Sequence, residues 1–181
     1  MNTPTKNSLI ICALLLVTTS ALLFLSSTIE SPTHHPAPAL AVDATEIAPD
    51  EILGMEKIVV SCGTDALQLV KQSHSGSIDN VLDVAIVHYM KEDRLLSLWT
   101  TLYPNETIAS TENEKMAVAM QKWGGSWASN LRAVTIAGKP VYETSSGEVT
   151  HYFWAENEWV FYIIPHNFTQ DEIAMIIGAI P

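Results

Sequence analysis

The chain has 181 residues, a formal net charge of −11 at pH 7 and 48% hydrophobic residues. This acidity argues against a nucleic-acid partner, because such binding is driven by Lys and Arg contacts to phosphate. The part of the chain beyond the first 50 residues has the size of one domain with one hydrophobic core.

The first element is an uncharged apolar run from Asn7 to Ile29. A helix rises about 1.5 Å per residue, so roughly 20 such residues cross a bilayer core of about 30 Å. We therefore predict an N-terminal transmembrane anchor within residues 1–29, which contacts the membrane through residues 7–29. A lysine precedes the run and Glu30 follows it, so we expect a single-pass cell-membrane protein with a cytoplasmic N-terminus and an extracytoplasmic domain.

Two other fates of the N-terminal segment stay open. Ala39-Leu40-Ala41 has the small-x-small form of a signal-peptidase site, although it lies well beyond the apolar core. Cys12 is a candidate for lipidation, but Ile10 and Ile11 stand before it where small residues are wanted. Both alternatives still place the domain outside the cytoplasm.

A Pro-rich segment follows the apolar run over residues 30–50. Segments of this composition bury too little surface to offset the entropy of ordering. We predict a disordered tether here, followed by an extracytoplasmic domain over residues 51–181. His34-His35 is interpreted as polar spacer rather than as a metal site.

The domain begins with an ambiguous segment. Apolar residues recur at spacings of three and four from Ile52 to Leu69, which is typical of a helix, with Asp50 as its cap. Alternatively, Ile58–Val60 is a short strand and the helix is confined to Thr64–Ser73.

Two strands and a helix come next. Val81 to Met90 and Leu95 to Tyr103 predict a hairpin around a charged turn. On the first strand, Val84, Ile86 and His88 lie on the more apolar side, which we expect to face the core. A loop is predicted over Pro104–Thr111.

After that loop, Glu112 to Trp123 reads as an amphipathic helix that stops at Gly124-Gly125. Residues 131–137 and 140–144 are predicted strands, the second of them edge-like.

The last predicted hairpin pairs Val149–Ala155 with Trp159–Ile164 around Asn157, which suits a left-handed turn position. Thr169 is expected to cap a final helix over Gln170–Ile177. Hairpins with interspersed helices predict an α+β fold: a mostly antiparallel sheet of about five to six strands with helices packed on one face, preceded by one transmembrane helix.

Candidates for chemistry are few. Cys62 is the single cysteine of the domain, and we expect a buried small hydrophobe rather than a nucleophile. His88 and His151 lie on predicted strands, and they would meet only if those strands were neighbours; no metal-binding spacing supports them. We assign no catalytic residue, no metal ligand and no cofactor.

The aromatic residues of the last hairpin are the candidate site for a ligand or partner. Tyr152, Trp154, Trp159 and Phe161 crowd two strands, and other aromatics lie beside them. Aromatics on both faces of a hairpin indicate either a sheet covered on both sides or an exposed surface for an apolar small molecule or a protein partner.

Two sequons, at Asn105 and Asn167, are candidate N-glycosylation sites in a host that glycosylates outside the cytoplasm.

The C-terminal part of the chain resembles a known family. The stretch from Val134 to Val141, then Thr150 to Trp154, Trp159 to Tyr162 and a closing helix is similar to the C-terminal part of extracytoplasmic lipoprotein-carrier-like domains, whose relatives occur in membrane-anchored anti-sigma and cell-surface proteins. The resemblance covers about 45 residues in a strand pattern. It implies binding of a ligand or partner rather than catalysis, and it carries over no functional residue.

The leading interpretation is a membrane-anchored, non-enzymatic extracytoplasmic domain that binds a partner or ligand. The alternatives are a hydrolase acting on envelope material and a purely structural envelope protein. A cleft with several convergent polar groups of shifted pKa would favour the hydrolase, an apolar groove without them would favour binding, and the absence of a cleft would favour the structural role.

Overall fold

The computed structural model describes residues 43–73 and 78–181, all of which belong to one compact unit. Within this part of the chain no helix is long and apolar enough to cross a bilayer. The expected anchor at residues 7–29 lies outside the described residues, so it stays a prediction.

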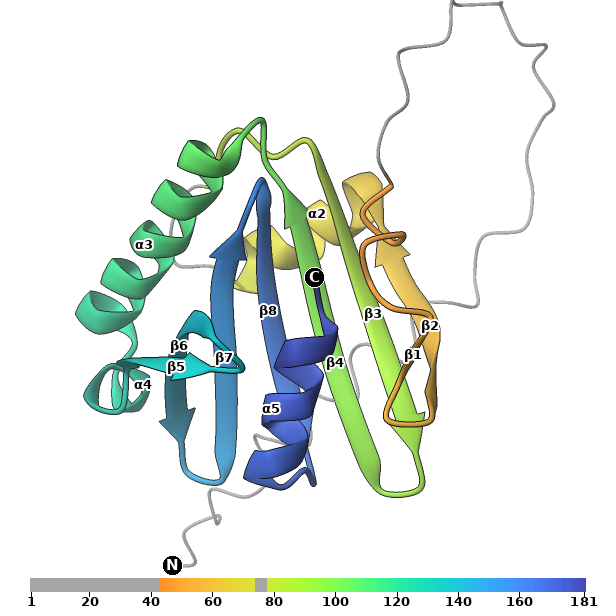
Figure 1. The fold of residues 1–181 in the computed structure, drawn as a ribbon. Coiled ribbons are helices and arrows are strands. Elements are labelled where there is room, and N and C mark those ends of the chain that lie inside the picture. The colour runs from red at the N-terminus through yellow and green to blue at the C-terminus, as the bar shows by residue number, and fades with distance from the viewer. Residues whose placement is uncertain (1–42, 74–77) are drawn as a thin grey trace, which may run out of the picture. The chain divides into compact units, whose positions relative to one another are not determined.

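In the described residues, eight strands form one antiparallel sheet in the order β1-β2-β3-β4-β8-β7-β6-β5 (Figure 1). The strands are β1 (Glu51–Ile52), β2 (Met55–Cys62), β3 (Asp83–Lys91), β4 (Arg94–Leu102), β5 (Arg132–Ile136), β6 (Lys139–Ser146), β7 (Val149–Glu156) and β8 (Trp159–His166). The helices are α2 (Gly63–Ser73), α3 (Glu106–Trp123), α4 (Ser126–Ser129) and α5 (Gln170–Ala179).

The predicted α+β class with an antiparallel sheet is confirmed, whereas five to six strands was too few. The expectation that helices cover one face is also wrong. α5 packs on one face, in front of the sheet in Figure 1, while α2 and α3 pack on the other. We call these the α5 face and the α3 face. The reason is that the central strands carry large apolar side chains on both sides, and both sides need cover.

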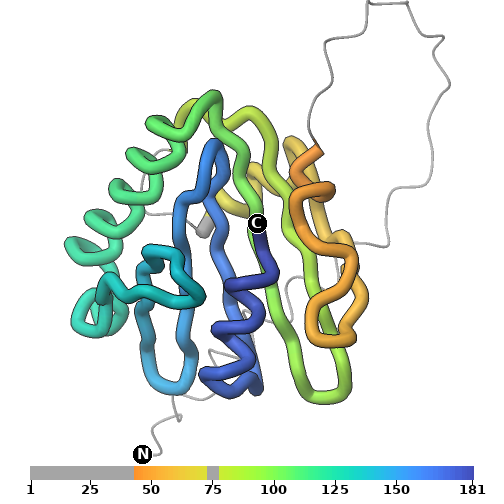
Figure 2. The backbone as a smooth tube through the Cα atoms, in the orientation of Figure 1, coloured from red at the N-terminus to blue at the C-terminus, as the bar shows by residue number. Residues whose placement is uncertain are grey.

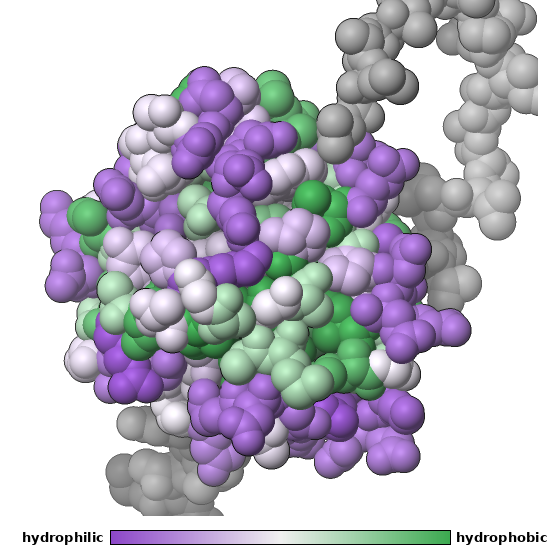
Figure 3. Space-filling view, viewed as in Figure 1, coloured by the Kyte–Doolittle hydropathy of each residue, from purple (hydrophilic) through white to green (hydrophobic). Residues whose placement is uncertain are grey.

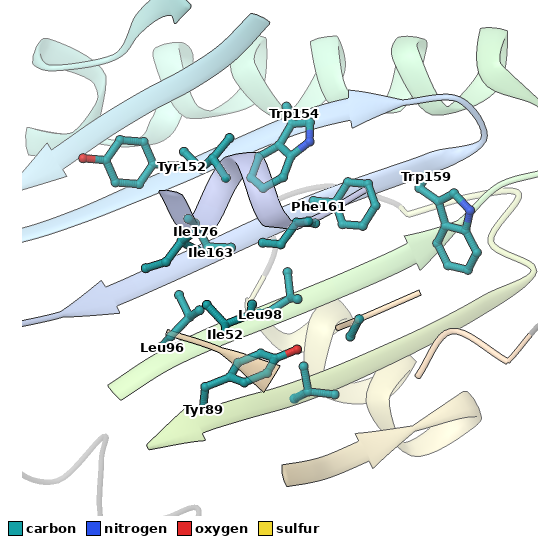
Figure 4. Packing of buried hydrophobic residues seen from close by; sticks show 14 of the residues in the cluster. Ile52, Tyr89, Leu96, Leu98, Tyr152, Trp154, Trp159, Phe161, Ile163 and Ile176 are labelled. Carbon is teal, nitrogen blue, oxygen red and sulfur yellow. The ribbon is translucent and has the colours of Figure 1, made fainter. Parts of the chain in front are cut away.

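The main hydrophobic core lies on the α5 face. Alternate residues of β3, β4, β7 and β8 meet the buried side of α5 there, and Figure 4 shows them converging. The fully buried large side chains of this core include Tyr89, Leu96, Leu98, Tyr152, Trp154, Phe161, Ile163, Ile176 and Ile177. Seen from this side, apolar residues gather in the middle of the surface inside a hydrophilic rim (Figure 3).

Residues 43–50, which were expected to belong to the tether, are part of the domain. Ala44 and Ala48 are fully buried in the main core. The Thr100 hydroxyl donates to the Ala44 carbonyl at 2.7 Å, and Lys57 Nζ donates to the Ala48 carbonyl at 2.9 Å. Figure 2 traces this orange segment beside β2. The predicted start of the domain at residue 51 was too late. The alanines read as part of a disordered spacer, but they are small enough to pack closely against the sheet.

The ambiguous segment at the start of the domain follows the second alternative, a strand and then a helix. On β3, both sides are buried: Val84 and Ile86 lie under α2, and Val87 and Tyr89 lie in the main core. The expectation that only the first of these sides faces a core was therefore wrong.

α3 begins six residues earlier than predicted, so most of the expected loop over Pro104–Thr111 is helical. The Asn105 side chain accepts a hydrogen bond from the Ile108 amide, as an N-cap does. The predicted stop is confirmed. A Cβ at Gly124 would lie 2.3 Å from the Met120 carbonyl oxygen, so only glycine fits at this close approach.

The C-terminal predictions hold with small shifts of boundary. Asn157 takes a positive φ of 52° in the β7–β8 turn. Thr169 caps α5 in a capping box with Glu172. The Thr169 side chain accepts a hydrogen bond from the Glu172 amide, and the Glu172 side chain accepts one from the Thr169 amide. β5, and not β6 as predicted, is the edge strand.

Candidate functional site

The four aromatic residues expected to bind a ligand all lie in the main core. Tyr152 and Trp154 are fully buried, and Phe161 and Trp159 are 1% and 5% exposed. The register pairs Trp154 with Phe161, and their rings stack at 5.3 Å between centroids. These side chains form the interior under α5, so the candidate site has to be sought on the other face of the same hairpin.

On the α3 face, four aromatic residues form a row across β4, β8, β7 and β6. Trp99 pairs with Tyr162, Tyr162 with Phe153, and Phe153 with Tyr142. Their ring centroids lie 5.6, 5.8 and 5.1 Å apart in that order. Such cross-strand pairs stabilise a sheet and give it a flat apolar surface.

A groove lies between α3 and one end of this row, where Trp99 and Tyr162 line it. It consists of two hollows of about 480 and 370 Å³. Both are lined by Trp99, Met116, Ala119, Trp123 and Tyr162, so they are neighbours, and we call the two together the aromatic groove. Volumes of this size match those of small-molecule sites.

The wall near α4 holds a hydrogen-bonded polar pair. His151 Nδ1 and the Tyr162 hydroxyl are 2.5 Å apart. The Trp127 ring covers His151, with 4.4 Å between ring centroids. Burial lowers the pKa of His151 to about 4 and raises the pKa of Tyr162, so both groups are neutral at pH 7.

The other end of the groove is acidic. Glu112 is buried and forms an ion pair with Lys115 at 2.7 Å. Glu114 also lines this end. Burial and the charge of Glu112 raise the pKa of Tyr103, which lies on the groove wall. The phenol is therefore neutral, and carboxylates dominate the local field.

The groove opens to solvent past Trp123. This side chain is 59% exposed, although it is large and apolar. Lys122 Nζ lies 4.7 Å from the centre of the Trp123 ring, in a cation–π arrangement. An exposed tryptophan at the mouth of an apolar groove is a natural contact for a ligand.

The remaining sequence candidates do not join this groove. Cys62 is exposed at the end of β2, so the expectation of a buried thiol was wrong. His88 and His151 lie on β3 and β7, which β4 and β8 separate. With strands about 4.8 Å apart, this places the two backbones roughly 14 Å apart, too far for a shared metal ion. Within the described ranges, no group of three or more His, Cys, Asp or Glu is placed to hold a metal.

The two sequon asparagines are both on the surface. The Asn105 side-chain oxygen caps α3, whereas the Asn167 side-chain nitrogen donates to the Asp93 carbonyl at 2.9 Å. Glycosylation uses the side-chain nitrogen, so modification of Asn167 would have to replace this bond. Use of either sequon stays a prediction.

Sequence reasoning singled out the hairpin, but the four residues it named are buried under α5, whereas the candidate groove lies on the other face. The signal that could have found the groove was the second set of aromatics on the same strands, together with the three tryptophans at 99, 123 and 127. Comparisons of the chain with protein-family models, curated proteins and solved structures found no match. The similarity to lipoprotein-carrier-like domains therefore stays a prediction from the sequence.

Proposed function

We propose that the protein is a membrane-anchored, extracytoplasmic binding domain without enzymatic activity, and that it takes an apolar ligand in the aromatic groove. The observation that supports this is the groove itself, open at Trp123 and walled by aromatic rings and methionines. Methionine is flexible and polarizable, so Met116 and Met120 suit contacts with ligands of varied shape.

The polar groups of the groove agree with binding better than with catalysis. His151 and Tyr162 bond to each other, and burial holds both in their neutral forms. Cys62, the one residue considered as a nucleophile, lies outside the groove lining. An apolar wall with a neutral polar pair orients a ligand without requiring proton transfer.

The test uses the full chain in nanodiscs and a neutral apolar fluorophore, 1-N-phenylnaphthylamine, with empty nanodiscs as the blank. Trp123→Ala should weaken binding about tenfold, since truncation of an aromatic contact commonly costs more than about 1 kcal/mol. Met175→Ala is the matched control, because Met175 is 60% exposed on α5, on the other face. If both variants bind the fluorophore as tightly as the parent, the aromatic groove is not the binding site.

One observation keeps the hydrolase alternative open. The His151 ring is neutral at pH 7, and in the tautomer whose Nδ1–H donates to the Tyr162 hydroxyl its second nitrogen can accept a proton from water or a hydroxyl in the groove. The test is an assay for ester or amide hydrolysis. Activity that is lost in His151→Gln but kept in Trp154→Phe would favour this second function.

A further inference from the structure

The aromatic groove has a charge preference. Three charged side chains line it: Glu112, Glu114 and Lys115. The single lysine is neutralised by its ion pair with Glu112 at 2.7 Å. The hydrogen bond to Glu112 and the charge of Glu112 raise the pKa of Lys115, and the charge of Asp79 adds to this effect. Carboxylates are therefore in excess where the groove meets α3.

The aromatic walls favour the same sign of charge. An aromatic ring carries negative charge on its face, so a cation above the ring is attracted. At the mouth, Lys122 already covers a face of Trp123 and adds one positive charge there, so the ring faces left for a ligand are the inner ones. Trp99, Trp127 and Tyr162 supply further ring surface inside the groove.

The whole chain also carries an excess of negative charge, with 20 acidic residues against 9 basic ones. A field of this sign attracts cations and repels anions on approach. Anionic ligands, such as phosphates and fatty-acid carboxylates, meet repulsion both at a distance and inside the groove.

We infer that the ligand of the aromatic groove is an organic cation with an apolar body, such as a quaternary ammonium or an aromatic amine. This inference rests on the proposed function, because it names the ligand class of the same site. The charged group lies at the acidic end, toward Glu112 and Glu114, where Trp99 and Tyr162 also line the groove. The apolar body extends toward Trp127.

The experiment compares three ligands of similar size on the full chain in nanodiscs of neutral lipid. They are phenyltrimethylammonium, its neutral isostere tert-butylbenzene and the anion benzenesulfonate. Binding is followed by the NMR signals of the five tryptophan indoles. The cation should bind about tenfold more tightly than the neutral isostere, and the anion more weakly than both.

Three variants then test the sign of the local charge. Lys115→Gln should raise the affinity for the cation about threefold or more, and Glu112→Gln should lower it by a similar factor. Neither should change the affinity for tert-butylbenzene by as much. Glu51→Gln, an exposed change on β1, alters the net charge equally and should have little effect.

The outcomes separate the two proposals. If the neutral isostere binds as well as the cation, or the anion binds best, the groove still binds ligands and only the cation inference fails. The cation inference alone also fails if 1-N-phenylnaphthylamine binds and the cation does not. If neither this fluorophore nor any of the three ligands binds, the proposed function fails as well.

Discussion

At the scale of single residues, His151 gives the stability of the domain a defined pH dependence. Burial lowers its pKa from 6.5 to about 4. Between these values the unfolded chain binds a proton that the folded domain does not, so the free energy of unfolding falls as the pH is lowered. Above pH 6.5 the effect vanishes. The loss should reach about 2 kcal/mol at pH 5, since one pKa unit corresponds to about 1.4 kcal/mol.

Urea denaturation at pH 7 and pH 5 measures this loss, and His151→Phe should remove most of it. The phenyl ring keeps the contact with Trp127 but leaves the Tyr162 hydroxyl without its partner, so the variant should be about 1–3 kcal/mol less stable at pH 7. Burial also lowers the pKa of His88. In His151→Phe, the free energy of unfolding should therefore still fall with decreasing pH, but less steeply. A variant with the full slope of the parent would show that His151 is not the titrating group.

Cys62 should react quickly in the native protein. It is exposed at the end of β2, and in the described residues the outer side of this strand has backbone partners only between Met55 and Lys57. Ellman's reagent should therefore modify the native thiol within about tenfold of the denatured rate, and Cys62→Ser should change stability by less than about 0.5 kcal/mol. The control is the denatured protein. Slow native labelling would contradict the exposure of Cys62.

Single residues also show how far the site could be predicted. Alternation divides strand β7 into two sets, Tyr152 and Trp154 against His151 and Phe153, but both sets consist of bulky ring side chains. Which set meets the main core depends on α5, a helix at the end of the chain that packs across the sheet. No pattern within the hairpin encodes that choice, so the sequence could not tell which set is buried under α5.

At the scale of elements, the hairpin β7–β8 should contribute most to stability. Trp154 and Trp159 are both buried on the α5 face and stack near Phe161. Trp154→Ala and Trp159→Ala should each cost about 3–5 kcal/mol, because each leaves a large cavity.

Trp123→Ala is the matched control for these two variants, since it removes the same side chain from an exposed position. Its free energy of unfolding should stay within about 0.5 kcal/mol of the parent in urea denaturation followed by circular dichroism. Near-neutral effects of Trp154→Ala and Trp159→Ala would mean that the hairpin is peripheral to the core.

Local signals predicted the elements whose ends are chemically marked. The turn at Asn157, the capping box at Thr169 and the stop at Gly124 each depend on a few neighbouring residues, and all three were found. The start of α3 was missed because Thr107, Ser110 and Thr111 have low helix propensity, which hides the cap at Asn105 within an apparent loop. Residues 43–50 were missed because their order comes from tertiary contacts with Lys57 and Thr100.

At the scale of the whole molecule, the distance to the membrane limits what the groove can meet. The predicted apolar run ends at Ile29 and the described domain begins at Asp43. An extended chain spans at most about 3.5 Å per residue, so the domain would stay within roughly 50 Å of the bilayer. On this prediction, the groove samples ligands close to the membrane surface, and the acidic surface keeps the domain away from anionic lipid heads.

The last prediction concerns this topology. If residues 7–29 anchor the chain with the domain outside, protease added to intact cells or spheroplasts should cleave between Ile29 and Asp43, because this Pro-rich segment is predicted to bury little surface. The domain should be released as a folded fragment, since Ala44 and Ala48 are packed into its core. A short stub should stay in the membrane fraction, and a cytoplasmic marker protein should survive as the control for intact cells.

The alternative fates give different products in the same experiment. Signal-peptidase cleavage after Ala41 would release the domain before any protease is added, with a mature N-terminus at Val42. Lipidation at Cys12 would keep the chain on the membrane but leave a stub of lower mass that carries the lipid. Protection of the domain in intact cells, together with its cleavage after lysis, would show that it faces the cytoplasm. That outcome would overturn the predicted orientation, which rests on the charges of Lys6 and Glu30 at the two ends of the apolar run.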